Sequence, residues 1–446
     1  MDWTEDAAQS LTQTFDGSFG AAGVVVGAAC IDGTGWASTV SPAGSPADGR
    51  FELGSVTKTM TATLVALLEA DNRLRLDDEI GRWLSAGANG GITVRQLATH
   101  TSGLPRLAPN LDLRTVDRAN PWAGFSFARA EEGLRQAVVA PGSPWLYSNF
   151  GYQLLGLVLE RASGCSYQQL ITDRLLVPLA MSCSGVGVGV GDGVGFGGGG
   201  VPLPGHNGDG EVPRWDHPFG AGGVEATISD LARYAQACLH PPRTPLGAAI
   251  TAALTPQFEV SDGRTQALAW QLRKDGIRVH GGGTAGFSSA VIVDPGRDRA
   301  VAILASCGPG YAQALGHAAF LALEGDDPRA ARPQPPGPEW DDRAREIVQL
   351  LLDGRTGDVH ARASSAFQSN ISVEQLERAW RTRSRGLGQV AEVLVSCSRP
   401  AGRIIADLTI TFAGGSLALR IGFEEPGQIA GLRFVPPREA QAILPE

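Results

Sequence analysis

Apolar runs of strand length occur early and late in the first 325 residues of this chain. They span residues 22–31, 290–294 and 300–305. The turn-forming residues 295–298 separate the last two runs, which predicts an antiparallel hairpin. Between the early and the late runs the apolar spacing becomes helical, as in residues 60–68. The pattern predicts a large domain whose sheet combines segments from both ends, with a mostly helical insertion between them.

A second, smaller domain is expected after a proline-rich stretch. Five prolines between residues 326 and 339 predict a semi-rigid linker. Three helical patterns and then four strand-like runs follow, and the turn signals between the runs suit an antiparallel meander. We therefore divide the chain into a domain of residues 1–325, a linker of residues 326–339 and a small domain of residues 340–446. The expected helices of the small domain lie near 341–353, 358–367 and 372–383, and its strands near 389–398, 403–412, 415–423 and 428–435.

Charge and composition argue against several classes of partner. The net charge is -9, with 46 acidic against 37 basic residues and no dense basic run, so neither a nucleic acid nor a membrane is an expected partner. No apolar run approaches the roughly 18 residues of a membrane span, and the chain start lacks a secretory pattern. Six widely spaced cysteines suit unpaired core thiols. We expect a cytoplasmic protein, and the lack of paired ligand spacings predicts no metal and no cofactor.

Lysine is almost absent from this chain. Of its 37 basic residues only Lys58 and Lys274 are lysines. Lysine can lose its proton when it is desolvated, whereas arginine cannot. The Lys58 amine follows Ser55 by one helical turn at the start of an apolar-periodic helix, where it can reach the serine hydroxyl and where the helix dipole favours an alkoxide. The spacing predicts a nucleophilic Ser55 activated by Lys58, with a solvated surface pair as the alternative, while charge or chance explains Lys274 at an Asp-Gly turn.

Two further stretches carry candidate chemistry. Tyr147-Ser148-Asn149 lies on a loop at a helix start. A tyrosine phenol near a lysine can be a phenolate or share its proton, and the asparagine amide can bind the lysine or a substrate carbonyl. The alternative is a packed tyrosine with a capping asparagine.

The second stretch begins at His280 and continues with Gly281, Gly282 and Gly283, where we expect the preceding strand to end. Glycines permit the close backbone approach that a substrate beside an edge strand needs. A free amide there can pair with the Ser55 amide as an oxyanion hole. The alternative is a bulge or a turn.

These three elements, in this order, resemble those of the penicillin-binding-protein and class C β-lactamase superfamily of serine enzymes. Residues 97–105, 220–224 and 229–232 are also similar to that superfamily. The resemblance covers roughly residues 10–320. It implies an α/β (α+β) β-lactamase-like serine hydrolase fold with an antiparallel sheet and a helical lobe.

The same resemblance implies a role for each candidate residue. Ser55 is the acylated nucleophile, and Lys58 and Tyr147 handle its proton. Asn149 orients the site. His280 takes the place of the lysine in the family's Lys-Thr-Gly motif. A mostly neutral histidine weakens recognition of a substrate carboxylate. In this respect the chain resembles the esterase, D-aminopeptidase and peptide-cyclising branches of the superfamily.

The glycine stretch is given a role by the same likeness. The oxyanion hole would consist of the Ser55 and Gly283 amides, and Gly281 and Gly282 would line the bound substrate. Two more distant residues, Trp215 and Arg438, are predicted to line the pocket, and Arg438 is suited to a peptide carboxylate. A packed loop tryptophan and a surface arginine are their alternatives.

The whole chain resembles the stand-alone penicillin-binding-protein-type thioesterases that release nonribosomal peptides. In that family the serine takes a peptide from a carrier-protein thioester, and the peptide's amino terminus closes a macrocycle. This implies a peptide acyl substrate and a carrier-protein partner. The appended domain there is lipocalin-like, and residues 340–446 fit a cone-shaped α+β domain equally well. The alternatives are a serine esterase or D-amino-acid peptidase with the same residues, and a sensor that becomes acylated and stops there.

Overall fold

The chain forms two compact units, which we describe separately. The boundary between them falls at Arg332, within the proline-rich stretch 326–339. Among the described residues, no helix is long and apolar enough to cross a membrane. The computed structural model describes residues 3–15, 23–111, 120, 122–139, 145–187, 199–207, 210–214, 216, 219–261, 263–308, 312–331, 337–398, 404–424 and 427–435.

An eight-stranded sheet is the framework of the first unit, in the order β2-β1-β14-β13-β12-β11-β10-β9. Because β1 pairs with β14 and β13 with β14, all antiparallel, the predicted hairpin and the predicted use of both chain ends are confirmed. The strands are β1 (Val26–Asp32), β2 (Trp36–Ser41), β9 (Phe258–Ser261), β10 (Arg264–Gln266), β11 (Gln271–Leu272), β12 (Arg278–Gly283), β13 (Ser288–Asp294) and β14 (Arg299–Ala305).

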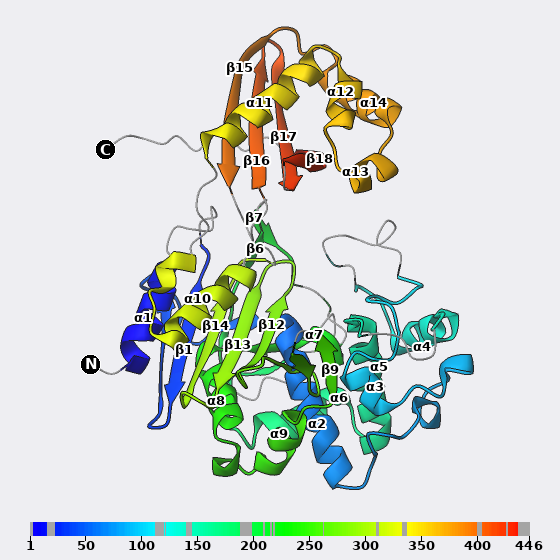
Figure 1. The fold of residues 1–446 in the computed structure, drawn as a ribbon, viewed down its shortest axis with the longest axis vertical. Helices are drawn as coiled ribbons and strands as arrows, with labels where there is room; N and C mark the ends of the chain where they lie inside the picture. The colour runs from blue at the N-terminus through cyan, green and yellow to red at the C-terminus, as the bar shows by residue number, and fades with distance from the viewer. Residues whose placement is uncertain are drawn as a thin grey trace. The chain divides into compact units, whose positions relative to one another are not determined.

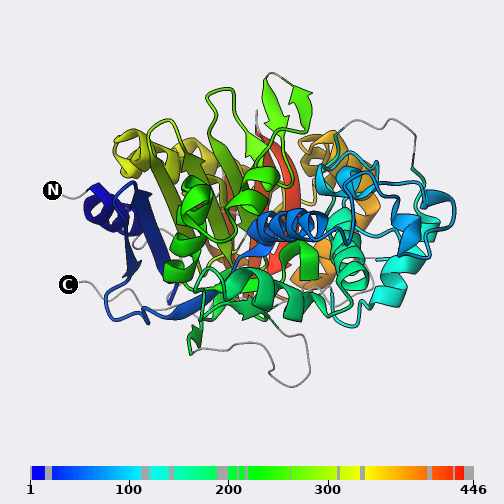
Figure 2. The same cartoon turned by 90° about the horizontal axis from the view of Figure 1, so that it is seen from below.

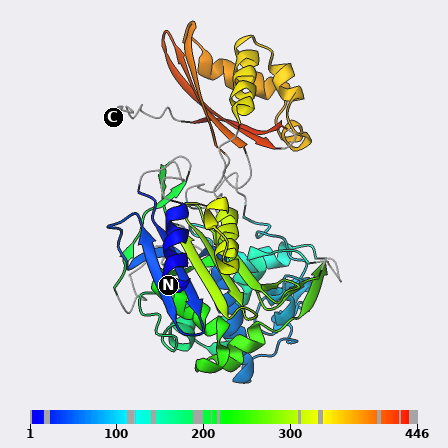
Figure 3. The ribbon, with the colours of Figure 1, turned by 60° about the vertical axis from the view of Figure 1, so that its left-hand side comes forward.

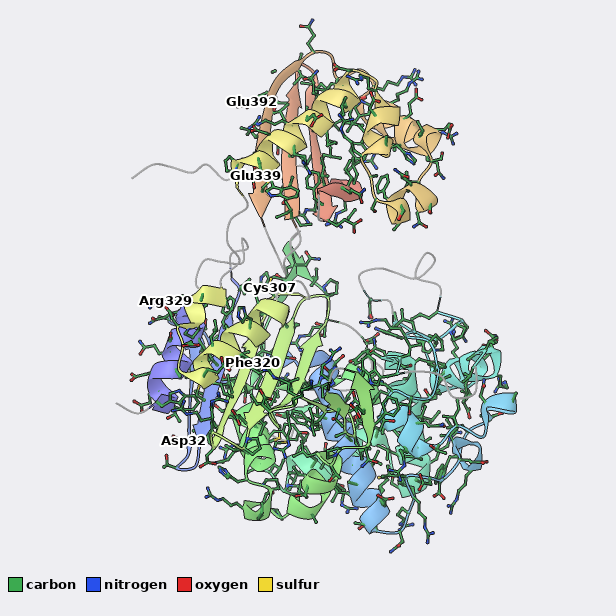
Figure 4. The ribbon with its side chains drawn as sticks, in the orientation of Figure 1. Asp32, Cys307, Phe320, Arg329, Glu339 and Glu392 are labelled. Atoms are coloured by element: carbon green, nitrogen blue, oxygen red, sulfur yellow. The ribbon has the colours of Figure 1, made fainter. Side chains whose placement is uncertain are left out.

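Helices cover both faces of this sheet, which is why β13 and β14 read as continuous apolar runs. On one face lie α1 (Trp3–Thr14) and α10 (Ala312–Glu324), side by side in Figures 1 and 3. Figure 4 labels Phe320 on α10, and the Arg273 guanidinium lies 4.8 Å from the centre of its ring. Together α1 and α10 bury one of the two cores of this unit against the sheet.

The other face carries the larger core and the helical insertion. Here α8 packs on β1 and β14, and α2 packs on α5, α7 and α9. Figure 2 shows α2 in blue near the centre of the unit, with the cyan helices to one side. The helices are α2 (Thr57–Ala70), α3 (Val94–Ala98), α4 (Phe127–Gln136), α5 (Asn149–Ser163), α6 (Tyr167–Ile171), α7 (Phe219–Gly222), α8 (Ile228–Leu239) and α9 (Gly247–Ala253).

Two small sheets complete the first unit. One has the strand order β4-β8-β3-β5, and the other pairs β6 with β7. Short η segments include η1 (Gly54–Val56) and η7 (Pro328–Ala331). The strands are β3 (Gly49–Glu52), β4 (Gly185–Val186), β5 (Val201–Pro202), β6 (Gly205–Asn207), β7 (Gly210–Val212) and β8 (Val224–Ala226).

The second unit is an antiparallel meander with helices on one face (Figure 3). Burial alternates along β16, whose inward side chains share a core with α11, α12 and α14. The three predicted helical regions and the four predicted strands are all present. Two short helices, α12 and α13, stand where one helix was expected at 358–367. Two folds were considered for this domain, a lipocalin-like barrel and a cone-shaped α+β fold. The four-stranded sheet with helices on one face fits the α+β fold. The elements are α11 (Pro338–Leu352), α12 (Thr356–Ala361), α13 (Ser365–Asn370), α14 (Val373–Ser384), β15 (Val390–Ser398), β16 (Ile404–Phe412), β17 (Gly415–Glu424) and β18 (Gln428–Val435).

All six cysteines are free thiols, as predicted. Three of them are buried, namely Cys30, Cys238 and Cys307, and the other three are partly exposed. The prediction that the cysteines lie in the core therefore holds for half of them. Figure 4 places Cys307 and Asp32 at opposite ends of the large sheet. Burial raises the pKa of the Cys307 thiol to about 12, which keeps it protonated and unreactive near neutral pH.

Candidate active site

Ser55 lies in a tight turn between β3 and α2. The turn is η1, and α2 itself begins at Thr57, so the serine precedes the helix rather than forming its first turn. Gly54 has φ +50°, a left-handed conformation. A Cβ atom at Gly54 would lie 2.8 Å from the Gly283 backbone nitrogen, so this turn requires glycine. The Ser55 turn is therefore held directly against β12.

The Lys58 amine meets the Ser55 hydroxyl inside the protein. Lys58 Nζ lies 3.0 Å from Ser55 Oγ and donates a hydrogen bond to Ala221 O at 2.6 Å. The side chain is fully buried, whereas Lys274 is exposed. Burial, and to a lesser extent the Arg106 charge, hold the pKa of Lys58 well below its usual value. A neutral amine with a free lone pair can accept the serine proton.

Tyr147 completes a group of three around the serine hydroxyl. Its side chain is hydrogen-bonded to Ser55. Lys58 Nζ lies 5.1 Å from the centre of the Tyr147 ring, and the Arg106 guanidinium carbon lies 5.3 Å from it. Burial raises the pKa of Tyr147 to about 12, although the Ser55 hydrogen bond and Arg106 oppose the rise. Of the two predicted forms, the structure therefore favours a phenol that shares a proton over a phenolate.

Asn149 stands at the start of α5, beside Tyr147. The helix cap is Ser148, whose Oγ accepts from Gly151 N at 2.8 Å, so the capping role considered for Asn149 belongs to its neighbour. The backbone amide of Asn149 donates to Arg106 O at 3.0 Å. Within the described part of the chain, no side-chain hydrogen bond of Asn149 is found, which leaves its amide group available to a substrate.

His280 lies on β12 and faces the same core as Lys58. Its Nδ1 donates to Gly281 O at 2.8 Å, and its Nε2 is buried with no partner among the described residues. Burial, followed by the Lys58 charge, lowers the pKa of His280 to about 3. The ring is therefore neutral near pH 7, and Nε2 presents an unused hydrogen-bond acceptor.

The glycine stretch does not end the strand, contrary to the prediction. β12 continues through Gly283 in regular register with β13, without a bulge, and only Arg278 and Val279 pair with β11 on the other side. The prediction placed the end of the strand at these glycines because glycine is a poor strand former. In the structure the glycines allow β12 to pack closely against the Ser55 turn. A Cβ atom at Gly282 would lie 3.0 Å from the Ser55 backbone nitrogen.

The Gly283 amide points away from β13. Thr284 N donates to Phe287 O on the β13 side at 2.9 Å. Successive residues of an antiparallel strand direct their N–H groups to alternate sides, so the N–H of the preceding residue, Gly283, points to the edge of β12 that faces away from β13. That edge is the one that approaches Gly54 and Ser55. The Ser55 and Gly283 amides therefore lie on two facing backbone segments, as an oxyanion hole requires.

Two residues near the site were missed by the sequence analysis. His100 is buried, and its ring centre lies 4.4 Å from that of Tyr147. Arg106 acts electrostatically on both Lys58 and Tyr147. The only available signal for His100 was its place in the family-like stretch 97–105.

The two predicted pocket residues are not tested by the structure. Trp215 and Arg438 both lie outside the described residues.

Comparison with known proteins places the first unit in a family. The beta-lactamase family matches residues 11–325. "Penicillin-binding protein 4*" of Bacillus subtilis (strain 168) is 35% identical over 145 residues, which are 30% of this chain and 29% of that protein. The D-alanyl-D-alanine-carboxypeptidase/endopeptidase AmpH of Escherichia coli (strain K12) is 34% identical over 145 residues, 30% of this chain and 36% of that protein. Each match thus spans only about a third of the relative.

The fold is also found among solved structures. A class C beta-lactamase matches with a TM-score of 0.59 and 21% identity, covering 72% of this chain and 95% of that one. At this identity the likeness concerns the fold alone. The family match, in contrast, extends over most of the chain and includes every element that surrounds Ser55. This chain therefore belongs to the beta-lactamase family, within the superfamily of serine hydrolases that also contains the penicillin-binding proteins.

Proposed function

We propose that this chain is a serine peptidyl transferase that releases a nonribosomal peptide from its carrier thioester by head-to-tail macrocyclisation. The observation that carries the proposal is the neutral His280 ring beside Lys58, with a buried acceptor that no described residue uses. An acceptor suits the N–H of an incoming amine, whereas a substrate carboxylate would need a cation or a donor. The site thus favours transfer to an amine.

In the first half of the proposed reaction, the neutral Lys58 amine takes the proton of Ser55. The serine oxygen attacks the thioester carbonyl, and the Ser55 and Gly283 amides hold the resulting oxyanion. The tetrahedral intermediate collapses, the carbon–sulfur bond breaks, and the thiolate receives the proton from Lys58. An ester between the peptide and Ser55 remains.

In the second half, the free amino terminus of the same peptide attacks the ester. His280 Nε2 accepts a hydrogen bond from the amine and orients it, while Lys58 and Tyr147 return its proton to Ser55 Oγ as the ester bond breaks. The products are a cyclic amide and the free serine. Transfer to the amine requires that it be held at the acyl carbon while water is kept out.

A second candidate function uses the same residues for hydrolysis. The relative from Escherichia coli is named a D-alanyl-D-alanine carboxypeptidase and endopeptidase, and it shares 34% identity over 145 residues. A serine esterase or D-amino-acid peptidase would form the same ester on Ser55 and release it with water. The two functions therefore differ only in the second half of the reaction.

Product analysis with one peptide in two forms separates these functions. A linear peptidyl thioester with a free amino terminus is mixed with the protein, and the products are followed by chromatography with mass detection. We expect mainly a cyclic peptide, one water lighter than the linear acid, and only linear acid from the N-acetylated form. Linear acid from both forms would support the hydrolase and contradict the cyclase. A lasting adduct without product would support the acylated sensor.

A further inference from the structure

His100 is bonded to the backbone on both sides of Tyr147. Its carbonyl oxygen accepts from Leu146 N at 2.8 Å, and its ring Nδ1 accepts from Ser148 N at 3.1 Å. The imidazole also packs on the Tyr147 ring, with ring centres 4.4 Å apart and planes inclined by 35°. The backbone and the side chain of His100 together thus hold the peptide groups before and after the tyrosine, and the side chain also contacts its ring.

The backbone of His100 is in an unfavourable conformation for its residue type. Its φ is +61°, in the left-handed region, and the side chain is only 1% exposed. Such a conformation costs about 1–3 kcal/mol outside glycine and persists only where the surrounding structure imposes it. Here the same backbone directs the carbonyl oxygen to Leu146 and the ring to Ser148.

The neutral form of His100 is the one that these hydrogen bonds require. Nδ1 can accept from Ser148 N only while it carries no proton, so the ring proton resides on Nε2. Burial, followed by the charges of Lys58 and His280, holds the pKa of His100 well below its usual value. Within the described residues Nε2 has no partner, so the bond from Ser148 N is the ring's hydrogen bond there.

We propose that His100 is a positioning residue, which holds the Tyr147 hydroxyl against Ser55 by fixing the peptide groups on either side of the tyrosine. The proposal rests on the acyl-enzyme chemistry proposed above, because it matters only where Tyr147 moves the Ser55 proton. It concerns the formation of the ester on Ser55 and is independent of whether an amine or water removes that ester.

Two substitutions separate the acceptor from the backbone conformation. In His100→Asn, the amide oxygen takes nearly the place of Nδ1, and asparagine tolerates a left-handed φ. In His100→Gly, the backbone is equally well accommodated but the acceptor is lost. With p-nitrophenyl butyrate as the acyl donor, we expect His100→Gly to lower kcat by about 100-fold with little change in KM, as misplacement of a reacting group by about 1 Å does. We expect His100→Asn to remain within about fivefold of the wild type.

A double substitution tests whether His100 acts through Tyr147. If it does, adding His100→Gly to Tyr147→Phe lowers kcat no further, because the group being positioned is already absent. A merely structural role would lower kcat by the same factor in both backgrounds. Thermal melts followed by circular dichroism establish that each variant is folded at the assay temperature.

Several outcomes would overturn the proposal. Full activity of His100→Gly, an Asn variant as poor as the Gly variant, or losses that multiply in the double variant would each contradict it. A wild-type rate equal to that of Ser55→Ala would remove the acyl-enzyme and this proposal together. Failure of cyclisation alone would leave the ester-forming rates intact, so the two failures are distinguishable.

Discussion

Burial of Lys58 costs stability but supplies the form of the amine that the chemistry needs. Among the described residues no acidic side chain pairs with the buried Lys58 amine, so its charged form is unfavourable and its pKa falls well below the usual value. Below the usual lysine pKa the unfolded chain therefore binds more protons at this residue than the native chain does. The native state is penalised accordingly, and stability should increase as the pH rises towards the usual lysine pKa of about 10.4. The same neutral amine is what Ser55 needs as a base.

Replacement of Lys58 by arginine should remove activity while it keeps the positive charge. Arginine cannot be deprotonated, so Lys58→Arg cannot accept the serine proton, and we expect the rate of ester formation to fall by at least about 100-fold. The measurement is the initial burst with p-nitrophenyl butyrate, with Lys274→Arg as the matched control at an exposed site. Appreciable activity in Lys58→Arg would exclude the base role. In Lys58→Met, Tm should also rise less steeply between pH 7 and 10 than in the wild type.

At the residue scale, the scarcity of one residue type singled out a candidate in the sequence. Lys58 stood out because the chain has only one other lysine, and burial now gives the physical reason for keeping it. His100 could not be found in this way, because a left-handed backbone and a hydrogen bond to Ser148 leave no mark on the pattern of residues. That no described residue bonds to His280 Nε2 was likewise visible only in the fold.

At the scale of elements, glycines are needed where β12 approaches the Ser55 turn. Burial alternates along its end, so Gly282 faces inward and Gly281 outward. Both have ordinary strand φ values, and only their surroundings differ. The β13–β14 hairpin was predictable because its apolar runs and turn are local signals. The end of β12 was not predictable from the sequence. Its glycines are needed because the strand packs against Leu53 and Ser55, which are more than 200 residues away in sequence.

A pair of alanine substitutions tests this packing. In Gly282→Ala the new methyl group would overlap Leu53 O and the Ser289 hydroxyl, so β12 must move away from the Ser55 turn. We expect a loss of about 1–3 kcal/mol in stability and a marked loss of activity. In Gly281→Ala the nearest atom is Ser289 O at 3.7 Å, an ordinary contact, and stability should stay close to that of the wild type. Chemical denaturation with a parallel burst assay provides the comparison, and equal effects of the two substitutions would contradict the packing argument.

At the scale of the whole molecule, each unit has a hydrophobic core of its own. The family match and the residues around Ser55 all belong to the first unit, so the site at which we propose ester formation lies in that unit. The general fold was predictable because its apolar pattern and the three motifs agreed. Whether an amine or water removes the acyl group from Ser55 was not predictable in this way. That choice depends on what surrounds the acyl carbon rather than on the residues that form the ester.

The most direct test of the central claim is the intact mass of the protein after brief exposure to an N-acetylated peptidyl thioester, with rapid acid quenching. The blocked amino terminus prevents cyclisation and so favours accumulation of the ester. We expect the mass to increase by one peptidyl group, located on the proteolytic fragment that contains Ser55, and we expect no increase in Ser55→Ala. An unmodified wild-type protein that also yields no product, or an adduct that persists in Ser55→Ala, would contradict the account.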